Sequence, residues 1–211
     1  GSGKTRTLTH RVAYLLATGT KPENILALTF TNKAAEEMKN RVKEILGENN
    51  FSQKLFIGTF HKLGVIILKD LLKITQRKSN FVIFDEEDSL KLIKDCLVEL
   101  NLSKEQFIPA NVRNEISRAK NELILPNDYE SMADNFFQKN TAKIYKSYEE
   151  KLLNNNAFDF DDLITLPVKI FQTHPEILGK YQDKWRYILV DEYQLKYNAI
   201  YLDIFPKFQD K

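Results

Sequence analysis

The first five residues carry the residue types that hold phosphate groups. Gly1-Ser2-Gly3-Lys4-Thr5 matches the second half of the pattern G-x-x-x-x-G-K-[ST]. In this pattern backbone N–H groups surround the phosphates, the lysine meets the outer phosphates, and the Ser/Thr hydroxyl binds Mg²⁺. The first glycine of the pattern, and the strand that would lead into it, are expected before Gly1. These five residues are therefore predicted to bind a nucleoside triphosphate.

A pair of carboxylates near the other end of the chain completes this chemistry. Asp191 and Glu192 follow the apolar run 187–190, which predicts a buried strand. Such a strand brings its last residues to the edge where open α/β sheets bind ligands. We expect Thr5 and Asp191 to hold Mg²⁺, Lys4 to neutralise charge on the β- and γ-phosphates, and Glu192 to orient or deprotonate the attacking water. The alternative is a Gly-Ser-Gly linker and an ordinary strand end, but the two segments come in the order that nucleotide hydrolysis requires.

The spacing of apolar residues indicates the elements that position these segments. It predicts a helix directly after the loop, strands at 25–30, 55–59 and 187–190, and a helix at 32–46. From about 60 to 185 the apolar residues recur at helical spacing. The predicted fold class is therefore α/β, with a parallel sheet domain interrupted by a large all-α insertion.

Two of these predicted strands end at an aromatic residue with polar neighbours. The segments are Thr29-Phe30-Thr31-Asn32 at the end of the strand 25–30 and Thr59-Phe60-His61 at the end of the strand 55–59. An aromatic ring at a sheet edge could stack on the bases of single-stranded nucleic acid. A phenylalanine in the core followed by a Thr/Asn helix cap explains the first segment equally well.

The acidic run Asp159-Phe160-Asp161-Asp162-Leu163 has two interpretations. It could be a metal cluster, but a helix start, where carboxylates cap free N–H groups and face the positive end of the dipole, is favoured. The single cysteine, Cys96, lies in a helical apolar pattern and is expected to be a buried thiol.

Charge is unevenly distributed along the 211 residues. Residues 1–80 carry 14 Lys/Arg and 6 Asp/Glu, whereas residues 81–211 carry 17 and 23. The basic first part suits an anionic partner, either nucleotide or nucleic acid, although solvated helix faces could give the same count. No apolar run approaches the ~18 residues of a membrane span, and a cytoplasmic setting is the default expectation for a chain with one cysteine.

The motifs, taken in order, resemble those of UvrD/Rep/PcrA-type superfamily 1 DNA helicases over essentially the whole chain. The matching segments are residues 1–5, 27–38, 58–61, 159–163 and 188–194, and the Thr-Phe-Thr-Asn-Lys-Ala-Ala run is the most specific of them. The resemblance implies an ATP-driven, Mg²⁺-dependent 3′-to-5′ translocase that separates duplex DNA in repair or replication. It also implies a first RecA-like motor domain at 1–60 and 186–211, with a helical insertion at 61–185.

The resemblance also assigns roles to individual residues. Arg6 resembles the family's nucleotide-contacting arginine, and Gln194 lies where the family relays the nucleotide state. Single-stranded DNA is expected along two segments, Thr29, Phe30, Thr31 and Asn32 in one, and Thr59, Phe60 and His61 in the other.

The chain departs from the family pattern in three places. The front of the phosphate loop and the adenine-reading glutamine segment are absent, and so is the second RecA-like domain with its arginine fingers. Leu195-Lys196-Tyr197 replaces the usual Asp-Thr-Asn. The chain by itself is therefore expected to be inactive in unwinding. A small-molecule kinase with a helical lid, or a DNA-binding module without ATPase activity, are the alternative functions.

Overall fold

The computed structural model describes residues 3–47 and 53–191, apart from the side chain of Lys4, and divides the chain into two compact units. The first unit comprises residues 1–64 and 170–211, and the second comprises residues 65–169. Two helices, α3 (Phe60–Asp70) and α9 (Asp162–Thr173), cross from one unit into the other. The units are described separately below.

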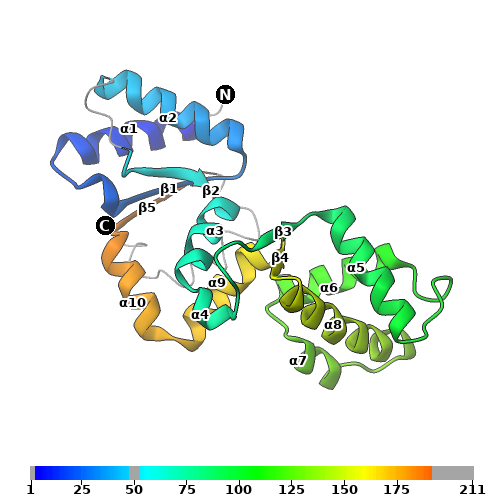
Figure 1. Cartoon of the computed structure of the whole chain (residues 1–211). Helices are drawn as coiled ribbons and strands as arrows, with labels where there is room; N and C mark the ends of the chain where they lie inside the picture. Colours follow the sequence, from blue (N-terminus) through cyan, green and yellow to red (C-terminus); the bar gives the residue numbers. More distant parts are fainter. Residues whose placement is uncertain (1–2, 48–52, 192–211) are drawn as a thin grey trace. The chain divides into compact units, whose positions relative to one another are not determined.

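The first unit is built on a parallel sheet with strand order β2-β1-β5. Its elements are α1 (Gly3–Ala17), η1 (Pro22–Asn24), β1 (Ile25–Thr29), α2 (Asn32–Leu46), β2 (Phe56–Thr59), α10 (Pro175–Lys184) and β5 (Tyr187–Val190). Figure 1 shows α1 and α2 side by side over one face of the sheet and α10 on the other. The α/β class and the parallel sheet predicted from the sequence are confirmed.

The central strand β1 explains why this sheet forms. All five of its residues are buried, as expected for a strand covered on both faces. On one face Ile25 and Ala27 pack with Val12 of α1 and Met38 of α2 in the same core cluster. Gly47, with φ of 77°, follows the last residue of α2 in a conformation that favours glycine.

The second unit is mostly helical. It holds most of α3, α4 (Leu72–Thr75), α5 (Glu86–Glu99), α6 (Pro109–Asn121), α7 (Pro126–Ser131), α8 (Phe136–Asn154) and the start of α9. Helices α5 to α8 enclose a hydrophobic core of large buried side chains, among them Ile93, Phe107, Ile116 and Tyr148. Asp85 caps α5 in a reciprocal capping box with Asp88, so the acidic run 85–88 begins this helix.

The prediction of an all-α segment is wrong in one respect. Strands β3 (Val82–Phe84) and β4 (Ala157–Asp159) form a two-stranded parallel sheet inside it. Each strand has three residues, too few to show the alternation that identifies a strand in a sequence. Among the described residues, no helix is long and apolar enough to cross a membrane.

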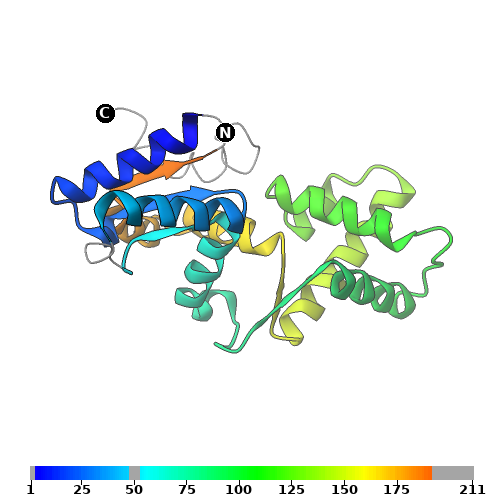
Figure 2. The ribbon, with the colours of Figure 1, turned by 90° about the horizontal axis from the view of Figure 1, so that it is seen from above.

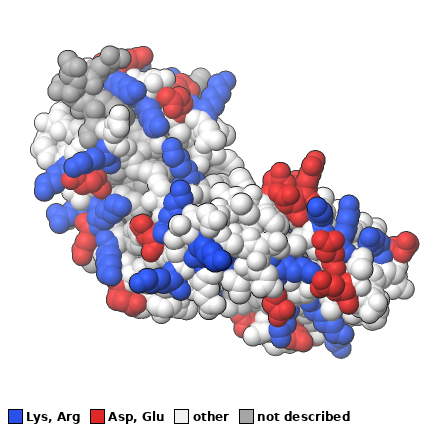
Figure 3. Space-filling model, in the orientation of Figure 1, with Lys and Arg blue, Asp and Glu red and all other residues white. Residues whose placement is uncertain are grey.

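Charge follows the division seen in the sequence. On the face drawn in Figure 3, Lys and Arg predominate over the part that holds α1 and α2, whereas both signs are mixed over α5 to α8. Figure 2 shows that α1 and α2 also lie next to each other when seen from above.

Candidate nucleotide site at the sheet edge

The carboxyl ends of the three strands of the first unit lie next to one another. Thr29 at the end of β1 pairs with Thr59 at the end of β2, and Leu28 pairs with Val190 at the end of β5. The Asp191 N–H donates to the Leu28 carbonyl oxygen at 2.9 Å, which extends this pairing by one residue. The strand ends that the sequence singled out therefore form one edge.

Thr5 and Asp191 meet at this edge although 186 positions separate them. The Thr5 hydroxyl, in the first turn of α1, donates a hydrogen bond of 2.8 Å to Oδ2 of Asp191. Asp191 is only 6% exposed. The fold thus brings the end of the phosphate-loop motif against the first carboxylate after β5.

The second oxygen of Asp191 is a candidate metal ligand. Oδ1 is buried and has no hydrogen-bond partner among the described residues. A buried carboxylate oxygen without a partner is costly, and a hydroxyl next to a carboxylate is the donor set that Mg²⁺ takes from proteins of the phosphate-loop type. Thr5 and Asp191 therefore fit a magnesium site.

The start of α1 suits an anion. Its first turn has no acidic residue, and helix amino ends attract phosphate through their free N–H groups and the helix dipole. Two threonine hydroxyls of this helix are turned to its own backbone, Thr7 to the Gly3 carbonyl and Thr9 to the Thr5 carbonyl. The Thr5 hydroxyl is the one directed at Asp191.

Several predicted nucleotide residues cannot be placed with these. Gly1, Ser2, Glu192 and Gln194 lie outside the described residues, as does the side chain of Lys4. Gly3 and Arg6 are described, and both are exposed at the start of α1. Their roles toward the nucleotide stay predictions.

At the end of β1 the aromatic residue is accessible. Phe30 is 44% exposed, next to exposed Thr31 and Asn32, whereas Thr29 is buried. The Thr31 hydroxyl accepts a hydrogen bond from the Ala34 N–H at 3.1 Å and so caps α2. The helix-cap interpretation is confirmed for Thr31, but Phe30 is not a core residue.

At the end of β2 the aromatic residue is buried. Phe60 is 3% exposed, so its ring has no face available for a base in this conformation. The Thr59 hydroxyl accepts from the Lys62 N–H at 3.2 Å. His61 is half-buried, and burial lowers the pKa of its imidazole below the ordinary value.

The two Thr-Phe pairs differ because their helices begin at different distances from the strand. Two residues, Phe30 and Thr31, separate β1 from α2, whereas α3 begins at Phe60 immediately after β2. The extra residues let the first ring turn outward, and the immediate helix start turns the second ring inward. Position after a strand does not by itself tell which ring is accessible.

A group of charged residues in the second unit was not found from the sequence. The ammonium group of Lys120 on α6 lies 2.7 Å from a carboxylate oxygen of each of Glu149, Asp159 and Asp162. Lys120 is 4% exposed. The signal for it was weak, because a lysine within an amphipathic helix normally faces solvent.

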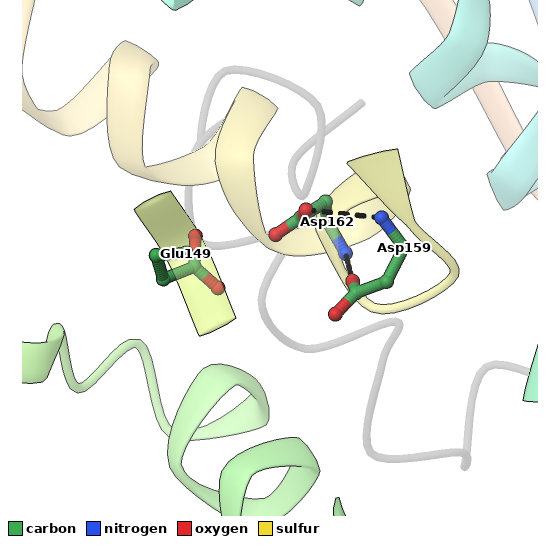
Figure 4. A group of neighbouring side chains, drawn as sticks. All are labelled: Glu149, Asp159 and Asp162. Carbon is green, nitrogen blue, oxygen red and sulfur yellow. Dashed lines mark hydrogen bonds between the residues drawn. The ribbon is translucent and has the colours of Figure 1, made fainter. Parts of the chain in front are cut away.

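The interpretation of the 159–163 run as a helix start is confirmed. The Asp162 N–H donates to Oδ1 of Asp159 at 2.8 Å, and the Asp159 N–H donates to Oδ2 of Asp162 at 3.1 Å. Figure 4 shows these two reciprocal bonds, with Glu149 facing them from α8. One oxygen each of Glu149, Asp159 and Asp162 lie within 4.8 Å of one another, close enough for a metal, but the ammonium group already takes the cation's place.

Burial and charge oppose each other in this group. Burial alone would lower the pKa of Lys120, but the attraction of Asp159, Asp162 and Glu149 raises it well above its ordinary value. Burial and the neighbouring charge of Asp159 raise the pKa of Asp162. The lysine therefore stays charged inside the protein.

Comparisons with known proteins identify the chain's family. A sequence model described as "UvrD/REP helicase N-terminal domain" matches residues 1–205. ATP-dependent DNA helicase PcrA of Bacillus subtilis is 46% identical over 203 residues, which are 96% of this chain and 27% of the relative. The PcrA proteins of Leuconostoc citreum (42% identity, 95% of this chain, 27% of the relative) and Staphylococcus aureus strain Mu50 (43%, 92% and 26%) are similar to it as well.

The chain thus spans about a quarter of the length of these curated relatives. Its family-model match covers nearly every residue, and the likeness extends across both structural units. By these matches, the chain belongs to the UvrD/REP helicase N-terminal domain family.

Proposed function

We propose that this chain is part of an ATP-dependent DNA helicase that moves 3′ to 5′ on single-stranded DNA. The observation that carries the proposal is the 2.8 Å hydrogen bond between Thr5 and Asp191. It joins the phosphate-loop motif to the carboxylate that follows β5, as a metal-dependent nucleotide hydrolase requires. The family and the names of the relatives support the same activity.

In this proposal the first unit is the RecA-like motor domain and the second unit is its insertion. ATP lies at the amino end of α1, with its phosphates on the backbone of residues 1–5 and on Lys4, and Arg6 beside it. Mg²⁺ bound to Thr5 and Asp191 would neutralise the charge that develops on the phosphates.

The residues after Asp191 activate the attacking water and relay whether ATP or its product is bound. Glu192 orients or deprotonates the attacking water, and Gln194 passes the state of the nucleotide to the DNA-facing loops. Leu195-Lys196-Tyr197 lies directly beyond Gln194, so the relay there uses side chains different from the family's usual Asp-Thr-Asn.

DNA runs along the carboxyl edge of the sheet, beside the nucleotide. Phe30 supplies a stacking ring, and Thr31 and Asn32 supply polar groups. Direct contact of DNA with Thr29, Thr59, Phe60 and His61 stays a prediction. Because Thr29, Thr59 and Phe60 are buried and His61 is half-buried, we assign the first contact with DNA to Phe30, Thr31 and Asn32. The other wall of the ATP cleft is a second RecA-like domain of the same protein.

The test is ATP hydrolysis by the whole protein with and without single-stranded DNA. We expect DNA to stimulate hydrolysis, and Lys4→Ala to abolish the stimulated rate. Lys21→Ala is the matched control, because Lys21 is an exposed lysine just before η1 and β1, at the opposite end of the strand. A stimulated rate that survives Lys4→Ala would falsify the assignment.

The same assay separates the two alternatives. A small-molecule kinase would transfer phosphate to an acceptor and show no stimulation by DNA. A binding module without ATPase activity would bind single-stranded DNA with a strong dependence on salt and hydrolyse no ATP.

A further inference from the structure

The charged group around Lys120 connects segments that are far apart in the sequence. Lys120 is near the end of α6 and Glu149 lies on α8, whereas Asp159 ends β4 and Asp162 begins α9. Its ammonium group donates hydrogen bonds of 2.7 Å to Oδ2 of Asp159 and Oδ1 of Asp162. One side chain therefore joins the α5–α8 helices to the turn between β4 and α9.

Neighbouring bonds reinforce the same junction. The Tyr148 hydroxyl, on α8, donates to Oδ2 of Asp159 at 3.0 Å. The Asn121 side-chain amide, next to Lys120, donates to Oδ1 of Asp161 at 3.2 Å. Among the described residues, the side-chain hydrogen bonds from α6 and α8 to residues 159–162 thus all end on a carboxylate of that turn.

The chain crosses between the α5–α8 helices and the rest of the second unit at only two described places, the segments 76–85 and 155–161. These two segments pair with each other as β3 and β4. The α5–α8 helices have their own hydrophobic core, while Leu68, Phe158 and Leu163 belong to another. The charged group lies where these two cores meet.

We propose that Lys120 is a positioning residue that fixes the α5–α8 helices onto the β4–α9 turn through its contacts with Asp159, Asp162 and Glu149. One consequence of this role rests on the proposed function. Because α9 continues into the first unit at Ile170, the orientation of α5–α8 at the start of α9 would influence how DNA binding is coupled to ATP hydrolysis.

Apolar packing alone could hold the α5–α8 helices against the β4–α9 turn, so the buried charged group needs a separate explanation. Buried charges are expensive and are often replaceable by apolar side chains at no loss of stability. What a buried ion group supplies is a single permitted geometry, since any shift of α6 leaves carboxylates without their cation. Positional specificity is therefore the role that this arrangement suits best.

Chemical rescue tests this role. Lys120→Ala opens a space that n-propylammonium can fill, because that ion has the three carbons and the nitrogen that the substitution removes. Lys120→Met removes the charge but fills the space, and Lys143→Ala removes an exposed lysine on α8. n-Propanol has nearly the shape of n-propylammonium without its charge.

The readout is hydrogen exchange at the Asp159 and Asp162 amides, which donate to each other's carboxylates. We expect both Lys120 variants to exchange faster there by about a hundredfold or more, because removing one partner leaves uncompensated buried charge. n-Propylammonium should restore protection in Lys120→Ala alone, and n-propanol should not. Lys143→Ala should behave as the unmodified protein.

Two outcomes would overturn the proposal. One is unchanged exchange in Lys120→Met, and the other is equal rescue by n-propanol, which would mean that only packing is needed. If Lys120→Ala unfolds the second unit, recovery of protection with n-propylammonium still decides the question.

A parallel measurement of ATP hydrolysis in the whole protein keeps the two proposals distinct. Absence of DNA stimulation in the unmodified protein counts against the proposed function and leaves the exchange result intact. Lys120→Met should retain hydrolysis without DNA, while its stimulation by DNA falls. Unaltered stimulation together with fast exchange would refute the coupling consequence.

Discussion

Two buried tyrosines on α8 allow the strength of the charged group to be measured. Tyr145 and Tyr148 are both 2% exposed and lie less than one turn apart. The Tyr148 hydroxyl donates to the Asp159 carboxylate at 3.0 Å, whereas the Tyr145 hydroxyl donates to the Ile124 backbone carbonyl at 3.1 Å. Substitution of either by phenylalanine removes one hydroxyl and keeps the ring.

The two losses should differ because the acceptors differ in charge. A hydrogen bond to a charged group contributes about 1.5–3 kcal/mol to stability, and one between neutral groups about 0.5–1.5 kcal/mol. In Tyr148→Phe, Oδ2 of Asp159 keeps its bond from Lys120 at 2.7 Å, so the cost should stay within the first range. We expect Tyr148→Phe to destabilise the second unit by about 1 kcal/mol more than Tyr145→Phe.

Native-state hydrogen exchange in increasing urea gives the local free energies. The reporters are the α8 amides and the Asp162 amide, which donates to Asp159. Equal losses in the two variants, or a larger loss in Tyr145→Phe, would refute the view that the carboxylate group is the stronger tie. The double variant shows whether the two effects are additive, as they should be if Ile124 and Asp159 are independent acceptors.

Three further predictions concern the sheet edge. Asp191→Asn should weaken binding of a fluorescent ATP analogue to the whole protein at least about tenfold when Mg²⁺ is present, and should change it little when Mg²⁺ is chelated. An equal loss without Mg²⁺ would contradict the metal role. Phe30→Ala should weaken single-stranded DNA binding by about 1–3 kcal/mol in fluorescence anisotropy and lower the melting temperature less than Phe60→Ala does. Phe60→Ala should destabilise the protein by about 3–5 kcal/mol. The reverse pattern would show that the two rings are wrongly assigned. Burial lowers the pKa of His61, so the unfolded chain binds a proton there more readily than the folded chain does. The contribution of His61 to stability is therefore present above the ordinary histidine pKa of 6.5. It is lost as pH falls through the folded-state pKa. The urea midpoint should therefore fall less between pH 7.5 and pH 5 in His61→Gln than in the unmodified protein, with His10→Gln as the control. Identical pH dependence in all three proteins would contradict a buried neutral imidazole at position 61.

Much of the fold was predictable from residue spacing. The helix 32–46 and the strand 187–190 have the predicted bounds, because long amphipathic and fully apolar runs leave few alternatives. The Thr5–Asp191 contact was predictable too, since a phosphate loop and a strand-end carboxylate both belong to the carboxyl edge of a parallel sheet.

Other features depend on contacts that spacing does not reveal. Strands β3 and β4 are three residues long and pair across more than seventy positions, so neither has a local signal. Whether Phe30 or Phe60 faces solvent depends on where the next helix begins. Lys120 is buried because four acidic or phenolic groups on other elements surround it, and a sequence lists those groups without showing that they meet.

The position of β5 in the sheet has a consequence for synthesis of the protein. β1 and β2 are complete at Thr59, but β5, which pairs with the other edge of β1, begins only at Tyr187. Ribosomes add about 5–20 residues per second, so β1 waits on the order of ten seconds for its second neighbour. During that time the backbone N–H and C=O groups on this edge of β1 are open to pairing with other chains, a state that favours aggregation. We therefore expect the nascent first unit to bind molecular chaperones during this delay, while α5–α8, whose contacts are closer in sequence, can already fold.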